Sequence, residues 1–176
     1  MSGPFASRLA ELTRDLEPGG RRWVFVAYDQ LNDGLGWLAR LAPRELGVIV
    51  VECPEKAGRR PYHQQKLGYV LGNMRQFALE QAARGVLVRH VVSASYLEAL
   101  TKLAAELGPL TMMEAAEREL RHELAPLIAS GGLVVTAHEG WLTSAADFSA
   151  SQKRPPWKME PFYQHVRKRT GILMEG

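Results

Sequence analysis

Residues 62–85 read YHQQKLGYVLGNMRQFALEQAARG and form the longest uninterrupted helical pattern in the chain. Core-type side chains recur there at intervals of three and four, which is the period of one face of an α-helix. This stripe consists of Leu67, Val70, Leu71, Met74, Phe77, Ala78 and Gln81. Pro61 suits the first turn of such a helix, and Gly85 suits the residue after its end. The stretch therefore predicts one long amphipathic helix over residues 62–84.

Two polar side chains continue this stripe at its N-terminal end. His63 lies four residues before Leu67, and Lys66 lies four before Val70, so both are expected to point inward. A helix N-terminus carries free N–H groups and partial positive charge, so the pair is a candidate site for an anionic or hydrogen-bond-accepting ligand. The alternative is a partly buried, hydrogen-bonded His63 and a Lys66 that extends its ammonium to solvent. The helix alone leaves both interpretations open.

The composition is that of an ordinary globular protein. With 176 residues, the chain fits one domain that is large enough to bury a core. Hydrophobic residues make up 46% and charged residues 23%, and a net charge of +3 permits nucleic-acid contact without requiring it. The one cysteine, Cys53, excludes an internal disulfide and a cysteine-based metal site, and favours a reducing cytoplasm. No stretch predicts a signal peptide or a membrane-spanning helix.

Short apolar runs alternate with helical patterns along the chain. The runs cover residues 23–28, 48–51, 87–92, 110–113 and 133–137. Helices are expected over 5–16, 62–84, 95–106 and 115–129, the last with a break near Pro126, and 31–46 is expected to be roughly helical. Continuous apolar runs are typical of strands buried on both faces, and the alternation predicts parallel strands joined by right-handed crossovers. We therefore expect an α/β fold, a doubly wound (Rossmann-like) five-stranded parallel sheet with helices on both faces.

The chain is expected to have three parts. Residues 1–20 form a helical extension that ends at Pro18-Gly19-Gly20, and residues 21–143 form the α/β domain. Residues 144–176 form a linker rich in Ser, Ala, Lys and Pro, followed by a basic helix over 164–169. The apolar end at 171–176 favours a chain that continues into a further domain.

Polar residues follow the first two predicted strands. Asp29 and Gln30 come after the first strand, and Glu52 ends the second. In doubly wound sheets, ligands bind beyond the carboxyl ends of the strands, near the point where strand order reverses. His63 and Lys66 open the helix after the second strand, so these side chains are expected to converge on one crevice.

Other motifs carry less weight. Gly34-Leu35-Gly36 begins some five residues after Tyr28, too far from the strand for a dinucleotide-binding turn. The sequence contains no P-loop and no GxSxG elbow, and its histidines have no Ser or Cys neighbour that would make a triad. Cys53, after a buried strand, is expected to be inert packing. The Arg167-Lys168-Arg169 run is most simply a solvated helix face.

Four motifs in fixed order resemble one family. These are YDQL at 28–31, YHQQK at 62–66, NMRQFA at 73–78 and KMEPFYQHVRKRTGILM at 158–174. They are similar to segments of the deoxyribodipyrimidine photolyase-related proteins, which include bacterial iron–sulfur cryptochromes and six-four photolyases. The resemblance covers residues 23–176.

The resemblance implies a division of labour between domains. In this family an N-terminal α/β domain holds an antenna chromophore, typically 6,7-dimethyl-8-ribityllumazine. A helical C-terminal domain holds FAD, a 4Fe-4S cluster bound by four cysteines and the DNA-lesion site. This chain would then be the antenna domain of a photolyase or cryptochrome-like flavoprotein that harvests light for DNA repair or signalling. It would be non-catalytic alone and would meet DNA only through the other domain.

The resemblance also implies a set of site residues. Antenna contacts would come from Asp29, Gln30, Leu31, Glu52, His63, Lys66 and Val70. The chain departs from the family pattern at Tyr28, Lys56, Arg59 and Tyr62, which are further possible contacts. Two cations at positions 56 and 59 change the charge of the pocket, so that either a more anionic ligand or an empty, vestigial pocket is expected. The alternative function is therefore a stand-alone nucleotide-binding or regulatory module that has lost the antenna, and a weaker one is an interaction domain that docks through 171–176.

Overall fold

The computed structural model describes residues 3–58 and 61–172. The chain divides into two compact units, Met1–His138 and Glu139–Gly176. The first unit contains the sheet and most of the helices, and the second contains two helices.

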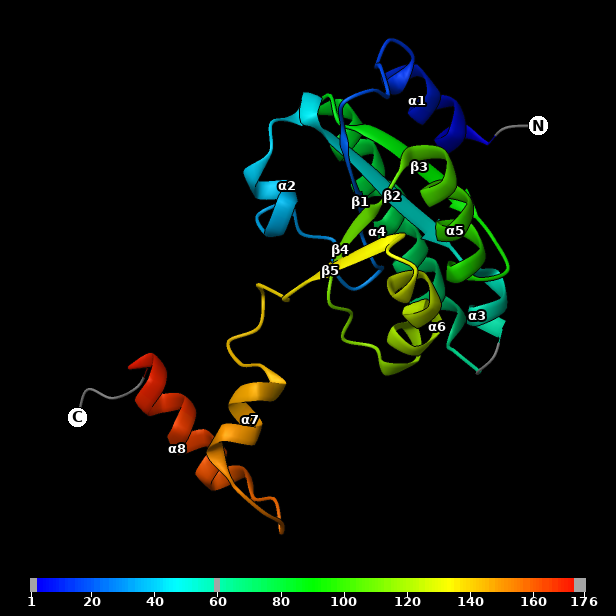
Figure 1. Cartoon of the computed structure of the whole chain (residues 1–176). Helices are drawn as coiled ribbons and strands as arrows, with labels where there is room; N and C mark the ends of the chain where they lie inside the picture. The colour runs from blue at the N-terminus through cyan, green and yellow to red at the C-terminus, as the bar shows by residue number, and fades with distance from the viewer. Residues whose placement is uncertain (1–2, 59–60, 173–176) are drawn as a thin grey trace. The chain divides into compact units, whose positions relative to one another are not determined.

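The first unit is built on a five-stranded parallel sheet (Figure 1). Its strands are β1 (Arg22–Phe25), β2 (Leu46–Glu52), β3 (Leu87–Val92), β4 (Leu110–Met113) and β5 (Leu133–Thr136). Their order across the sheet is β3-β2-β1-β4-β5, and every neighbouring pair is parallel. The chain moves outward from β1 to β3 and then crosses back to β4, so strand order reverses between β1 and β4. The predicted doubly wound α/β fold is confirmed.

Helices cover both faces of this sheet. One face packs against α1 (Pro4–Thr13), α2 (Gly36–Arg40) and α4 (Gln64–Ala83), through strand residues such as Val24, Val48 and Val50. The other face packs against α5 (Tyr96–Leu107) and α6 (Arg118–Ala129), through alternate residues such as Phe25 and Ile49. Because side chains alternate across a strand, one apolar run supplies both layers.

The segment between β1 and β2 is less helical than expected. It holds only the short α2 and a 3-10 turn at Pro43–Glu45. The side-chain oxygen of Asn32 accepts a hydrogen bond from the backbone N–H of Gly34, which fixes a turn where a helix could have begun. The prediction of a helix over 31–46 was therefore too long. A five-residue helix, α3 (Pro54–Gly58), follows β2.

The helix α6 also differs, because it continues through Pro126 to Ala129. The expected break does not occur. Pro126 is exposed and lies in the last turn, where solvent can bind the carbonyl that loses its partner.

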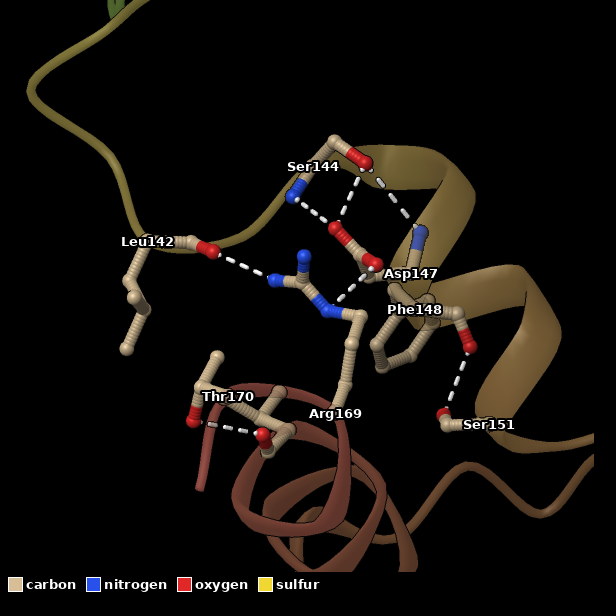
Figure 2. Close-up of polar contacts among 8 residues, drawn as sticks. Leu142, Ser144, Asp147, Phe148, Ser151, Arg169 and Thr170 are labelled. Carbon is tan, nitrogen blue, oxygen red and sulfur yellow. Dashed lines mark hydrogen bonds and ion pairs between the residues drawn. The ribbon is translucent and has the colours of Figure 1, made fainter. Parts of the chain in front are cut away.

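The second unit contains α7 (Ala145–Ser151) and α8 (Met159–Thr170). Residues 144–156, expected to be a linker, thus include a helix. Ser144 and Asp147 form a capping box at its start, which explains why this polar segment is ordered (Figure 2). Arg169 of α8 donates to the backbone oxygen of Leu142 at 2.6 Å and pairs with Asp147 at 3.1 Å. The Phe148 ring packs against Trp157 and Phe162.

Candidate ligand-binding site

A cavity of about 130 Å³ opens at the carboxyl ends of β1 and β2. Its floor contains Val51, Glu52 and Cys53, from the end of β2 and the residue after it. This is the edge of the sheet at which ligands bind in doubly wound folds. The cavity therefore lies where the sequence predicts a crevice.

One wall of the cavity is the N-terminal half of α4. Leu67, Val70, Leu71 and Met74 line it. Phe77, Ala78 and Gln81, from the other half of the same stripe, are buried in the core. The predicted stripe thus has two uses, because its second half packs on the sheet and its first half faces the cavity. Leu67, Val70 and Leu71 remain half-exposed for this reason.

Another part of the lining is aromatic, and the lysine beside it belongs to an ion pair. The Lys56 ammonium of α3 pairs with the Glu117 carboxylate, which precedes α6. The same ammonium lies 5.3 Å from the centre of the Tyr28 ring and 5.0 Å from that of Tyr96. Burial and the neighbouring Glu117 and Asp29 carboxylates raise the pKa of Tyr28 to about 12. Burial also raises the pKa of Tyr96.

The carboxylate of Glu52 is buried and fully paired. Arg75 of α4 donates to both of its oxygens, at 2.7 and 2.8 Å, and the His90 ring nitrogen lies 2.9 Å from Oε1. Burial alone would raise the pKa of Glu52, but the hydrogen bonds from Arg75 and His90 outweigh it and lower the pKa. The Phe5 ring of α1 packs edge-on against the His90 ring, with the ring centres 4.9 Å apart. Glu52 therefore holds α4 against the sheet.

Six of the residues predicted from the sequence line the cavity. They are Tyr28, Glu52, Lys56, Tyr62, Lys66 and Val70. Asp29, Leu31 and His63 lie outside this lining. Arg59 lies outside the described residues.

The Gln30 side chain is directed elsewhere. It is 5% exposed, and its amide donates to the backbone oxygens of Met113 at 3.4 Å and Glu114 at 2.9 Å. Gln30 thus fastens the loop after β1 to the end of β4, across the point where strand order reverses.

The expectation that His63 points inward is wrong. His63 is the N-cap of α4, its side chain is exposed, and its Nδ1 accepts a hydrogen bond from the Gln65 backbone at 3.3 Å. The stripe period fails here because an N-cap residue has extended rather than helical backbone angles. Lys66 does reach the cavity, and its ammonium lies 5.7 Å from the centre of the Tyr62 ring.

Sequence reasoning missed four residues around the site. Tyr96 and Glu117 follow β3 and β4, and only their position after predicted strands could have drawn attention to them. Arg75 and His90 had a clearer signal, because the acid at the end of a buried strand requires a cationic or hydrogen-bonding partner.

The part of the chain that the structure describes contains no group of three or more His, Cys, Asp or Glu side chains that could hold a metal ion. None of its helices is both long enough and apolar enough to cross a membrane.

The fold and the cavity define a doubly wound α/β domain with a ligand-sized crevice at the carboxyl edge of its sheet. Residues 24–176 match the family model described as "Deoxyribodipyrimidine photo-lyase-related protein". The chain belongs to this family, which confirms the resemblance seen in its motifs. It is also 24% identical over 164 residues to the "(6-4) photolyase" of Agrobacterium fabrum (strain C58 / ATCC 33970). That match covers 87% of this chain and 32% of the relative, so the chain spans about a third of the relative's length.

Proposed function

We propose that this chain binds an antenna chromophore, as the light-harvesting domain of a photolyase or cryptochrome-like flavoprotein. The observation that carries the proposal is the cavity lined by Tyr28, Tyr96 and the apolar stripe of α4. Flat heteroaromatic ligands favour such sites, in which apolar walls provide most of the contact and a few polar groups fix orientation. The candidate ligand that we propose for this cavity is the one implied by the family resemblance of the motifs, 6,7-dimethyl-8-ribityllumazine or a similar compound.

The size of the cavity supports a small ligand. Its volume of about 130 Å³ is below the range of roughly 300–1,000 Å³ that is common for drug-sized ligands. A ring system of two or three fused rings suits this space better than a dinucleotide such as FAD. Bound there, the chromophore would supply light absorption and energy transfer, while the residues of this chain bind it, orient it and exclude water.

The redox groups of the family do not fit this chain. A 4Fe-4S cluster requires about four cysteine ligands, whereas the chain has one. That residue, Cys53, is a buried free thiol whose Sγ donates to the backbone oxygen of Ala94 at 3.0 Å. We therefore assign FAD, the cluster and DNA contact to a partner domain of the photolyase type. We also propose a cytoplasmic location, because free thiols persist in reducing compartments.

One of the two cations that favoured a nucleotide-binding module no longer favours it. Lys56 was one of the two cations that favoured a phosphorylated ligand, but Glu117 neutralises it. The described cation of the lining that still favours a phosphorylated ligand is Lys66, which is exposed to solvent.

A titration tests the proposal. The purified protein is titrated with 6,7-dimethyl-8-ribityllumazine, FMN and ATP in parallel, and binding is followed by fluorescence polarisation or, for ATP, by thermal stabilisation. Saturable binding of the lumazine at micromolar or lower concentration is the expected result. Binding of ATP or FMN without binding of the lumazine would reject the antenna role in favour of the nucleotide-binding one.

A further inference from the structure

The ion pair of Lys56 and Glu117 lies largely out of solvent, and its lysine lines the cavity together with Tyr28 and Tyr96. The side chain of Lys56 is 13% exposed and that of Glu117 is 20% exposed. They come from different parts of the sheet edge, since α3 follows β2 whereas Glu117 follows β4. The pair therefore bridges the carboxyl edge of the sheet beside the Tyr28 and Tyr96 rings.

The charges that line the cavity are largely balanced among the described residues. Glu117 neutralises Lys56, and Arg75 neutralises Glu52. The remaining described cation of the lining is Lys66, which is exposed to solvent and lies against the Tyr62 ring. An entering anion would compete with Glu117 for the Lys56 ammonium and leave a half-buried carboxylate without its partner, which is costly.

We propose that Glu117 is a specificity-determining residue, which holds Lys56 and thereby selects uncharged ring systems over their phosphorylated forms. This inference rests on the proposed function, because it concerns the same cavity. An uncharged ligand needs only to pack against the tyrosines and the α4 stripe, and the ion pair stays intact. For a phosphorylated ligand, the Lys56 charge in the cavity lining is already neutralised by Glu117, so the phosphate gains no unpaired cation at this position.

Riboflavin and FMN make a matched pair of probes, because they share one ring system and differ by a phosphate. The measured quantity is the ratio of their dissociation constants, Kd(FMN)/Kd(riboflavin). We expect the wild-type protein to favour riboflavin. Glu117→Gln frees the Lys56 ammonium and should shift the ratio at least tenfold toward FMN.

Two further variants keep the test independent of folding defects and of overall charge. Lys56→Met leaves Glu117 as the remaining charge of the pair, so its ratio should favour riboflavin at least as strongly as in the wild type. Glu114→Gln removes the same charge from the same loop, but Glu114 lines a different hollow with Ala115 and Arg121, whereas Glu117 pairs with Lys56, so the ratio for Glu114→Gln should not change. Far-ultraviolet circular dichroism and thermal unfolding verify that each variant folds.

The outcomes separate this inference from the proposed function. If the wild type binds the lumazine but Glu117→Gln leaves the ratio unchanged, or Lys56→Met shifts it toward FMN, the inference fails and the antenna proposal stands. If the wild type binds neither lumazine nor riboflavin while Glu117→Gln gains FMN, the selectivity role stands and the antenna proposal fails. Absence of binding in every protein rejects both.

Discussion

The Arg75 guanidinium holds both oxygens of the Glu52 carboxylate, with Nε 2.7 Å from Oε1 and Nη2 2.8 Å from Oε2. Such two-point contacts fix geometry as well as charge. Glu52 ends β2 and Arg75 lies near the middle of α4, so the contact joins the floor of the cavity to one of its walls. The shape of the cavity therefore depends on a residue that does not line it.

Arg75→Gln should lower the free energy of unfolding by about 1–3 kcal/mol, because it leaves a buried carboxylate without its charged partner. Arg89→Gln is the matched control, since it removes an Arg from the exposed pair with Glu106, whose atoms are 2.9 Å apart. Exposed ion pairs contribute about 0–1 kcal/mol to the free energy of unfolding. Urea unfolding of both variants measures the difference, and equal losses would contradict the role given to Arg75.

Glu52 should also make stability depend on pH. Its pKa is lowered, because the hydrogen bonds from Arg75 and His90 outweigh the effect of burial. A lowered pKa in the folded state means that the carboxylate stabilises the fold above its ordinary pKa of 4.5. This contribution is lost as the pH falls through the lower, folded-state value. The difference in unfolding free energy between wild type and Glu52→Gln should therefore shrink as the pH falls below about 4.5. A difference that does not change under acid conditions would show that Glu52 is not ionised in the folded protein.

Tyr28 provides a spectroscopic test of the ion pair. Its pKa of about 12 results from burial first and then from the Glu117 and Asp29 carboxylates. Removing the negative charge in Glu117→Gln should shift the pKa of Tyr28 back toward its ordinary value of 10.0. Phenolate absorbance, taken as the difference between each protein and its Tyr28→Phe derivative, measures this shift. The same titration curve with and without Glu117 would place the hydroxyl away from that carboxylate.

Gly47 leaves no room for a side chain. It lies opposite Trp23 on the neighbouring strand, and an added Cβ would come within 2.5 Å of the Trp23 ring. Gly47→Ala should therefore destabilise the protein by about 1–3 kcal/mol. Gly72→Ala makes the same change on α4, where a Cβ meets no atom within 4 Å, and should stabilise by about 0.5–1 kcal/mol. A thermal shift of the same sign in both variants would contradict the packing described here.

The fold was predictable because it depends on periodic patterns. The continuous apolar runs that contain Val24–Phe25 and Val48–Val51 are typical of strands in a sheet covered on both faces. The alternation of strands and helices along the chain then indicates that the strands are parallel. Boundaries were less predictable where local hydrogen bonds decide them. Asn32 and Ser144 are examples, because their side chains cap or turn the backbone without any periodic signal.

The site was predictable only in part. The α4 stripe located the cavity wall at Val70 and the end of the second strand located Glu52, whereas Tyr28 was indicated only by the comparison with the family pattern. The partners of these groups could not be derived, because Lys56 and Glu117 are 61 residues apart in sequence and their contact exists only after the sheet has formed. In the sequence, the positive charge of Lys56 favoured an anionic ligand. In the structure, the Glu117 carboxylate neutralises that charge, so Lys56 no longer favours such a ligand.

The most direct test of the account fills the cavity and leaves its surroundings intact. Val70→Trp places a large ring in the cavity, whereas Tyr69→Trp makes a similar change at an adjacent position that is 73% exposed. Titration of the wild type and both variants with 6,7-dimethyl-8-ribityllumazine should give saturable binding to the wild type and Tyr69→Trp, and at least tenfold weaker binding to Val70→Trp. Equal binding by all three would place the ligand outside this cavity, and no binding by any of them would contradict the antenna function.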